Sequence, residues 1–185
     1  MVRPRTSDTK DRIRAVALEL FAEQGVQRTS LRQIAERLGL TKPALYYHFS
    51  SREELVRSLI QPLVDDVESF LARVEAEEDV DPRTLLAGYY DLYLRHRRIT
   101  ALVAREPDVL GYLDFAARVA DWRLRLIALL AGPDPSLEDR ARAVVAIGGL
   151  ADCTLVFIGM PPEELRSAAL NAACAALGPL LEKRS

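Results

Sequence analysis

The stretch that decides the fold covers residues 31–51 and reads LRQIAERLGLTKPALYYHFSS. It consists of two short amphipathic segments with helical spacing, joined at Gly39. Ser30 precedes the first segment and Gln33 follows three residues later, which is the spacing of a capping box. Thr41 precedes the second segment as its expected N-cap. Because the chain must turn at Gly39, a positive φ is expected there.

The apolar positions of this stretch fit two helices that cross closely. Ala35 is small where the helices must approach, and larger side chains supply a wedge that fixes their angle. The wedge residues are Ile34, Leu38, Leu40 and Leu45. The pattern predicts a helix-turn-helix, which presents the start of its second helix to a DNA major groove. An ordinary helical hairpin is the alternative explanation of the pattern taken alone.

Helical spacing of apolar residues continues over the rest of the chain, and strict strand alternation is absent from it. We therefore expect an all-α protein of about nine helices. Residues 1–51 are expected to form a three-helix DNA-binding domain and residues 52–185 a helical domain for ligand binding and dimerisation. The first helix of the second domain, over about 52–76, contains Pro62, which should kink or interrupt it.

Charge is distributed unevenly along the 185 residues. The formal net charge is −2, which by itself argues against a strongly basic nucleic-acid binder. Residues 1–60, however, hold 11 basic and 7 acidic side chains, a net of +4, whereas residues 61–185 hold 14 and 20, a net of −6. A basic front on an acidic body suggests that only the front meets a polyanion.

Several other classes of protein are disfavoured by composition. The two cysteines, Cys153 and Cys174, are isolated in apolar segments, which excludes a disulfide framework and a zinc module. No cofactor or metal site is expected. The first ten residues lack the apolar segment of a signal peptide, and no run approaches the length of a membrane span. A cytoplasmic protein is therefore expected.

Residue chemistry on the helix-turn-helix suggests how bases are read. An arginine such as Arg32, in the first turn of its helix, can donate two hydrogen bonds to guanine O6 and N7. Lys42 can reach a guanine or a phosphate, and Tyr46 a base or a sugar. Pro43 and Ala44 have no side-chain donors, so they suit contact with a thymine methyl or close approach. The alternative for Arg32 is a simple surface charge.

A dense set of short motifs surrounds this stretch. They are LFAEQG at 20–25, TS at 29–30, IA at 34–35, GLTK at 39–42 and ALYYHF at 44–49. Together they resemble the tetracycline-repressor (TetR) family of bacterial regulators, over roughly residues 9–60. The remainder of the chain agrees with that family only in being helical and of about the right length.

The resemblance implies a set of contacts between the first domain and DNA phosphates. The positions that match the family's phosphate contacts are Ser30, Thr41, Tyr47, His48 and Arg52. Hydroxyl groups there suit phosphate oxygens. For His48, a structural hydrogen-bonding role is an equally weighted alternative. Since neighbours on a helix point about 100° apart, Tyr46 and Tyr47 are not expected to face the groove equally, and one of them could pack inside.

In the family the helical body forms a dimer, and recognition of a palindromic DNA site also requires one. Two recognition helices related by a two-fold axis read a palindrome in successive grooves, whereas one covers only a few base pairs. The last two long helices carry small side chains that allow a close four-helix bundle. The interface candidates are Gly148, Ala151, Leu155, Ala169, Ala172 and Ala176. The alternative is that these helices pack only within the monomer.

In the family the body also binds a small-molecule effector, and mixed aromatic and polar residues suit such a pocket. The candidates are Tyr89, Tyr93, His96, Tyr112, Phe115, Trp122 and Asp152. The alternative is that aromatics at helical spacing form the core. Asp152 stands in an apolar run, so a buried carboxylate there would need an arginine partner, a dimer contact or the ligand.

These observations predict a ligand-responsive transcriptional regulator, expected to be a repressor that leaves a palindromic operator when its effector binds. The rivals are an enzyme or small-molecule-binding helical protein without a DNA role, and an architectural or purely protein-binding helical protein. An enzyme would need a nucleophile with its base, a metal cluster or paired carboxylates, and no spacing indicates one. A steep loss of DNA affinity with salt would favour the regulator.

Overall fold

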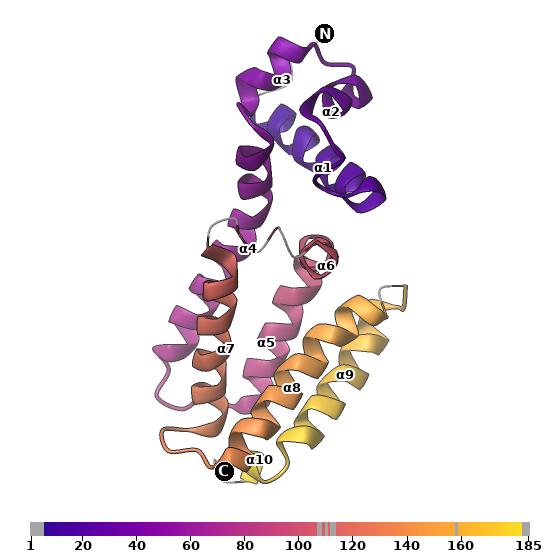
Figure 1. Cartoon of the computed structure of the whole chain (residues 1–185). Coiled ribbons are helices and arrows are strands. Elements are labelled where there is room, and N and C mark those ends of the chain that lie inside the picture. Colours follow the sequence, from indigo (N-terminus) through magenta and orange to yellow (C-terminus); the bar gives the residue numbers. More distant parts are fainter. Residues whose placement is uncertain (1–5, 107–108, 110, 112–113, 158, 183–185) are drawn as a thin grey trace. The chain divides into compact units, whose positions relative to one another are not determined.

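The computed structural model describes residues 6–106, 109, 111, 114–157 and 159–182, and this part of the chain is helical and without strands (Figure 1). Its helices are α1 (Thr6–Gln24), α2 (Leu31–Leu38), α3 (Lys42–His48), α4 (Arg52–Glu75), α5 (Pro82–Arg95), α6 (Arg97–Arg105), α7 (Phe115–Ala131), α8 (Leu137–Val156), α9 (Pro162–Leu177) and α10 (Pro179–Glu182). The all-α prediction is confirmed, and the nine expected helices form. Within these residues no helix is long and apolar enough to cross a bilayer.

The chain folds into two compact units. The first comprises Met1–Leu63 with Ala101–Phe115, and the second comprises Val64–Thr100 with Ala116–Ser185. The division falls inside α4 and α6, whereas the sequence analysis places the domain boundary at the start of α4. The difference arises because the first turns of α4 pack into the core of the first unit.

Helix α4 runs without interruption through Pro62. Its first half buries Leu55, Val56 and Ile60 completely. A proline inside a helix removes one backbone hydrogen bond. Burial of three large side chains in the preceding two turns offsets that loss, so the expected interruption does not occur.

The helix-turn-helix has the predicted caps. The Ser30 hydroxyl accepts a hydrogen bond from the Gln33 amide (3.2 Å), and the Gln33 side-chain oxygen accepts one from the Ser30 amide (2.8 Å). Gly39 ends α2 with φ of 65°, in the left-handed region that favours glycine. The Thr41 hydroxyl accepts from the Ala44 amide and so caps α3 (3.3 Å).

The core of the first unit is formed where α1 packs on α2 and α2 packs on α3. Ile13 of α1, Ile34 of α2 and Leu45 of α3 have no exposed surface. Ala35 is 2% exposed, as expected for a small residue at a close crossing. The outer wedge positions Leu38 and Leu40 are only half-buried. The angle between α2 and α3 is therefore set mainly by the fully buried side chains.

A buried threonine organises the turn between α1 and α2. Thr29 is 1% exposed, and its hydroxyl donates to the Gly25 carbonyl (2.8 Å) and accepts from the Gln24 amide nitrogen Nε2 (3.1 Å). Gly25 itself has φ of 89°, in the left-handed region, and directly follows the last residue of α1. One hydroxyl thus joins the end of α1 to the segment that leads into α2.

In the second unit, α8 and α9 lie side by side and α5 packs against both (Figure 1). Gly88 allows α4 to approach α5, because a Cβ atom there would lie 2.7 Å from Cε2 of Phe70. The last long helix, α9, ends at Leu177. Gly178 has φ of 52° and separates α9 from the short helix α10.

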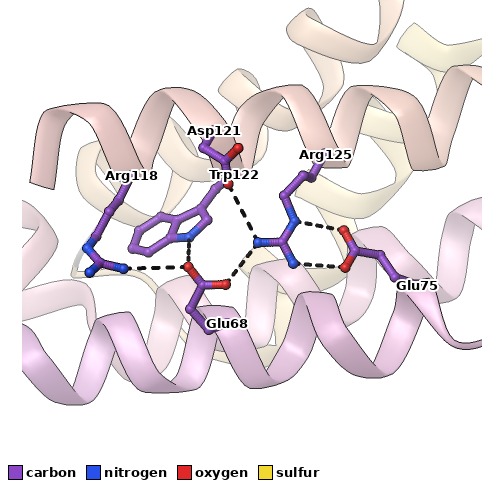
Figure 2. A network of polar contacts seen from close by, with 6 residues as sticks. All are labelled: Glu68, Glu75, Arg118, Asp121, Trp122 and Arg125. Atoms are coloured by element: carbon purple, nitrogen blue, oxygen red, sulfur yellow. Dashed lines mark hydrogen bonds and ion pairs between the residues drawn. The ribbon is translucent and has the colours of Figure 1, made fainter.

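A polar network joins α4 to α7 within the second unit (Figure 2). The Glu68 carboxylate accepts hydrogen bonds from Trp122 Nε1 (2.8 Å) and from Arg125 Nη1 (2.8 Å). Arg125 also donates to both oxygens of Glu75, from Nε at 2.7 Å and from Nη2 at 2.8 Å. The outer members of the network are Arg118 and Asp121. One guanidinium thus holds two carboxylates that lie two turns apart on α4.

The network lowers the pKa of both carboxylates. For Glu68 the main cause is the hydrogen bond from Trp122, followed by that from Arg125. For Glu75 the main cause is the pair of hydrogen bonds from Arg125. A carboxylate whose pKa is lower in the folded than in the unfolded state stabilises the fold above its unfolded pKa, about 4.3 for glutamate, and loses that contribution as pH falls.

We therefore predict that Arg125→Met reduces the decrease in unfolding free energy that accompanies a fall in pH. The unfolding free energy of the wild type should fall between about pH 5 and pH 3, as Glu68 and Glu75 take up protons on unfolding. The variant should be less stable at pH 7 and should lose less between those two pH values. Urea titrations at several pH values measure this. Arg142→Met is the control, because Arg142 pairs only with the exposed Glu138 among the described carboxylates. Parallel pH profiles for wild type and Arg125→Met would contradict the prediction.

A second prediction concerns the buried threonine. Thr29→Val keeps the shape of the side chain but leaves the Gly25 carbonyl without its donor, which should lower the unfolding free energy by about 1–3 kcal/mol. Thr154→Val is a matched control, because Thr154 is also 1% exposed but donates to the Ala151 carbonyl inside α8, where the helix supplies an amide donor. Equal losses of stability in the two variants, measured by thermal or urea unfolding, would refute a special role for Thr29.

Candidate nucleic-acid interface

Helix α3 presents an exposed face above its buried Leu45. Lys42 and Pro43 are exposed at its start, Tyr46 is 42% exposed and Tyr47 is 80% exposed. Neither tyrosine is part of the core, although Tyr46 is the more covered of the two. Both remain available to a groove or to a phosphate.

Ring contacts along α3 restrict these side chains. The Lys42 ammonium lies 5.5 Å from the centre of the Tyr46 ring, a cation–π contact within one turn. The Tyr47 and His48 rings meet edge to face with centres 5.3 Å apart. His48 is half-buried, and its buried Nδ1 has no hydrogen-bond partner in the described part of the chain. The geometry places no structural hydrogen bond on that nitrogen.

Arg32 projects from the first turn of α2 with 78% of its side chain exposed. Its Nε donates to Glu36 Oε1 at 2.7 Å, one turn further along the helix. The hydrogen bond from Arg32 to this carboxylate, supported by the opposite charges, raises the pKa of Arg32, so the guanidinium is fully charged. Arg32 is therefore a charged group on the surface beside α3.

The capping hydroxyls of Ser30 and Thr41 can each donate a hydrogen bond to a phosphate oxygen. Thr41 uses its oxygen as an acceptor for the Ala44 amide, which leaves the hydroxyl hydrogen to donate. Ser30 is exposed, and its hydroxyl donates to the Gln33 side chain at 2.9 Å in this structure. A phosphate oxygen would have to replace Gln33 as the acceptor for Ser30.

Arg52 has a role that the sequence analysis did not foresee. It begins α4, and its Nη1 donates to the backbone carbonyls of Gln27 (2.9 Å) and Val26 (3.3 Å), while its Nη2 donates to the Gln27 side chain (2.9 Å). Arg52 therefore ties the turn before α2 to the start of α4. Its expected phosphate contact stays a prediction, and its main visible role is to position the α1–α2 turn.

The first unit thus brings the candidate DNA-binding residues onto α2, α3 and the start of α4. Sequence reasoning missed the residues that hold them, notably Glu36, Thr29 and Gln27. The spacing of four between Arg32 and Glu36 would have indicated their ion pair. No comparable signal links Arg52 to Gln27, because the two are far apart along the chain.

The candidate effector residues do not form one cluster. Tyr89 and Tyr93 are in contact, with ring centres 4.7 Å apart, and burial raises the pKa of Tyr89 well above its usual value. His96 instead lies against α4, with Nε2 2.8 Å from the Asp66 carboxylate. Trp122 donates to Glu68 on the same helix. Two of the seven candidates therefore bind carboxylates of the protein.

The remaining candidates are placed differently again. Phe115 is 3% exposed and belongs to the first compact unit, while Tyr112 lies outside the described residues. Asp152 is exposed, so it needs no buried partner of its own. Its charge and that of Arg123 both act on the Tyr89 hydroxyl, in opposite directions. Tyr89, Phe115 and Trp122 are each less than 10% exposed and so contribute to packing, which is the core alternative stated above, and the effector site stays a prediction.

A groove of about 320 Å³ between α5 and α9 contains none of these candidates. Its polar lining includes Arg83, Thr84 and Arg166. Arg166 is held by a bidentate ion pair with Asp91 (2.7 and 2.9 Å), and Arg83 donates to Asn171 (2.9 Å). Both arginines are thus engaged in joining α5 to α9.

The dimer candidates divide into buried and exposed sets. Ala151 and Ala169 are 7% and 4% exposed in the single chain, so they serve packing within the protomer, the alternative stated above. Gly148 and Leu155 are half-buried on α8, and an added Cβ at Gly148 would meet no neighbouring atom. On α9, Ala172 is exposed and Ala176 is half-buried.

Larger apolar side chains on α8 and just after it were missed. They are Leu137, Val144, Val145, Val156, Phe157 and Met160, with exposures between 48% and 85%. Val145, Gly148, Gly149, Asp152 and Val156 repeat every three or four residues, so they share one face of α8. The exposed apolar side chains of this face are Val145 and Val156, and the face also carries the exposed carboxylate of Asp152.

Comparison with known proteins agrees with this picture. The sequence model of the family described as "Bacterial regulatory proteins, tetR family" matches residues 13–59. The HTH-type transcriptional regulator TtgR of Pseudomonas putida is 35% identical over 103 residues, which are 52% of this chain and 49% of TtgR. The HTH-type transcriptional regulator TcmR of Streptomyces glaucescens is 29% identical over 155 residues, 75% of this chain and 67% of TcmR. The alignment with TtgR thus spans about half of that relative's length.

Solved structures extend the likeness to the whole fold. A transcriptional regulator of the TerR/AcrR family from Aquifex aeolicus superposes with a TM-score of 0.71 and 25% identity, covering 90% of this chain and 98% of that one. The ketosteroid transcriptional regulator KstR2 of Mycobacterium tuberculosis superposes with a TM-score of 0.72 at 18% identity, covering 96% and 97%, which shows a shared fold. Residues 13–59 thus form a helix-turn-helix domain of the tetR family of bacterial regulatory proteins, and the fold of the whole chain is that of regulators of known structure.

Proposed function

We propose that the chain is a transcriptional repressor that binds a palindromic operator as a homodimer and is released by a small-molecule effector. The observation that carries the DNA-binding part is the exposed face of α2 and α3. It combines Arg32, Lys42, Tyr46 and Tyr47 over a fully buried core, within residues 1–60, which carry a net charge of +4. Family membership, and not the lack of a catalytic cluster, argues against an enzyme.

On this proposal, α3 enters the major groove and Arg32 approaches a neighbouring base pair from α2. The guanidinium can donate two parallel hydrogen bonds to guanine, which adenine, thymine and cytosine cannot accept in the same geometry. Tyr47 and Thr41 supply hydroxyl donors for phosphate oxygens, which set the register without reading sequence. The rigid caps of α2 and α3 reduce the ordering that binding requires.

The exposed small and apolar residues of α8 support the homodimer. Two copies of Gly148 and Gly149 would allow two α8 helices to approach closely, and the flanking valines would add buried apolar area. A two-fold axis places identical surfaces against each other, so one exposed face suffices. Exposed Ala172 on the adjacent α9 fits a four-helix arrangement.

Release by an effector needs a difference in affinity between two states. A ligand that bound the DNA-competent and DNA-free states equally would shift nothing, however tightly it bound. Tyr89 and Tyr93 contact each other, but Tyr89 is 5% exposed, so an effector would reach this pair only if the surrounding helices moved apart. The chemistry of these residues does not identify the compound more closely.

The DNA-binding face predicts graded losses of affinity. For operators selected from random duplexes by the wild type, Arg32→Ala should lose about 5- to 150-fold in affinity, the value of one bidentate base contact. Tyr47→Phe should lose about 2- to 10-fold, the value of one hydrogen bond. Arg37→Ala is the charge-matched control, because Arg37 is also on α2 but pairs with Glu23 of α1. Fluorescence anisotropy measures all three. Unchanged affinity in the first two variants would overturn the site assignment.

The dimer face predicts a selective effect of a buried charge. Val145→Asp should convert the protein to a monomer, since it removes apolar area from the α8 face and adds a second carboxylate to the one that Asp152 already places there. Leu124→Asp should not, because Leu124 is 67% exposed, against 62% for Val145, but lies on α7. Analytical ultracentrifugation distinguishes the two. A dimer that persists in Val145→Asp, or a wild type that is monomeric, would rule out this interface.

A further inference from the structure

One carboxylate lies at the candidate DNA interface in direct contact with an arginine expected to read a base. Glu36 is on the same side of α2 as Arg32, one turn further along, and accepts from Arg32 Nε at 2.7 Å. Both side chains are well exposed, at 60% and 78%. A carboxylate near DNA repels phosphates, so its presence at this position calls for a compensating role.

The pairing on α2 is selective. Arg37, the sequence neighbour of Glu36, reaches across to Glu23 on α1 at 3.2 Å. Glu36 is therefore left to Arg32. The pairing also uses a particular edge of the guanidinium, because only Nε of Arg32 contacts Glu36. Among the described residues, neither terminal nitrogen of Arg32 has a hydrogen-bond partner.

This geometry leaves the reading end of the arginine available. The two terminal nitrogens, Nη1 and Nη2, can together donate to O6 and N7 of one guanine. A hydrogen bond at Nε restricts rotation of the planar guanidinium without occupying these donors. An isolated arginine would lose that rotational freedom when it binds DNA, which costs conformational entropy. Because Glu36 already restricts the guanidinium in the free protein, much of that entropy loss does not accompany binding.

We propose that Glu36 is a positioning residue that sharpens the preference of Arg32 for guanine. This inference rests on the proposed function, since it assumes that Arg32 meets a base. Glu36 acts in two ways: it orients the guanidinium towards one base edge, and its charge weakens contacts of the same arginine with phosphates. Both effects favour the correct base pair over other DNA.

The test uses a double-mutant cycle on the full-length protein. Operators are selected from random duplexes by the wild type and by Arg32→Ala, and the G·C pair whose preference disappears in Arg32→Ala is taken as the pair that Arg32 reads. Affinities are then measured for that operator and for the same duplex with this pair replaced by A·T. The ratio of the two affinities is the guanine preference of each variant.

Glu36→Ala should reduce the guanine preference by about 2- to 10-fold, the entropic cost of ordering one long side chain. In the Arg32→Ala background, Glu36→Ala should leave the ratio of the two affinities unchanged. Glu36→Gln keeps an oxygen acceptor for Nε but loses the charge, so its preference should lie between those of Glu36→Ala and the wild type. Its affinity for unrelated DNA should rise, as that of Glu36→Ala should.

Glu23→Ala is the matched control, because Glu23 has a similar exposure of 58% and also pairs with an arginine of α2. It should leave the guanine preference unchanged, and melting temperatures establish that each variant is folded. Three outcomes would overturn the inference. Glu36→Ala could keep the guanine preference of the wild type, or Glu36→Ala could lower the ratio of the two affinities equally in the Arg32→Ala background. The third is that Glu23→Ala lowers the guanine preference as much as Glu36→Ala does. If the wild type selects no sequence, or Arg32→Ala loses no preference, the proposed function or its Arg32 assignment fails first, and the inference falls with it.

Discussion

The contact between α2 and α3 is the constraint on which the DNA-reading surface depends. Ile34 of α2 and Leu45 of α3 have no exposed surface, the two helices pack on each other, and the left-handed Gly39 allows the turn between them. With the crossing angle held from beneath, the outer faces of both helices need no packing role. Tyr47 can remain 80% exposed there without cost to the core.

Polar contacts hold the surroundings of this pair in place. Thr29 closes the turn before α2 from inside, and Arg52 closes it from the start of α4. In the second unit, Arg125 plays a comparable part by holding two carboxylates of α4 against α7. In each case one side chain with several donors or acceptors joins segments that are distant along the chain, and so replaces several weaker contacts.

Much of the first unit could be read from local patterns. The caps at Ser30 and Thr41, the turn at Gly39 and the buried Leu45 all follow from short spacings, and the structure confirms each. Predictions that required long-range contacts fared less well. The structure leaves Asp152 exposed, although an apolar sequence context suggested burial, because α8 has one face that its own chain does not cover.

Local sequence thus settles where helices begin and end and which of their faces are apolar, since caps and side-chain periodicity act within a few residues. Tertiary structure settles which apolar face is covered within the protomer and which polar groups pair. Ala151 lies inside while Val145 lies outside, and Arg52 serves the α1–α2 turn. The physical reason is that burial and pairing depend on neighbours brought together by the fold, which spacing along one helix does not specify.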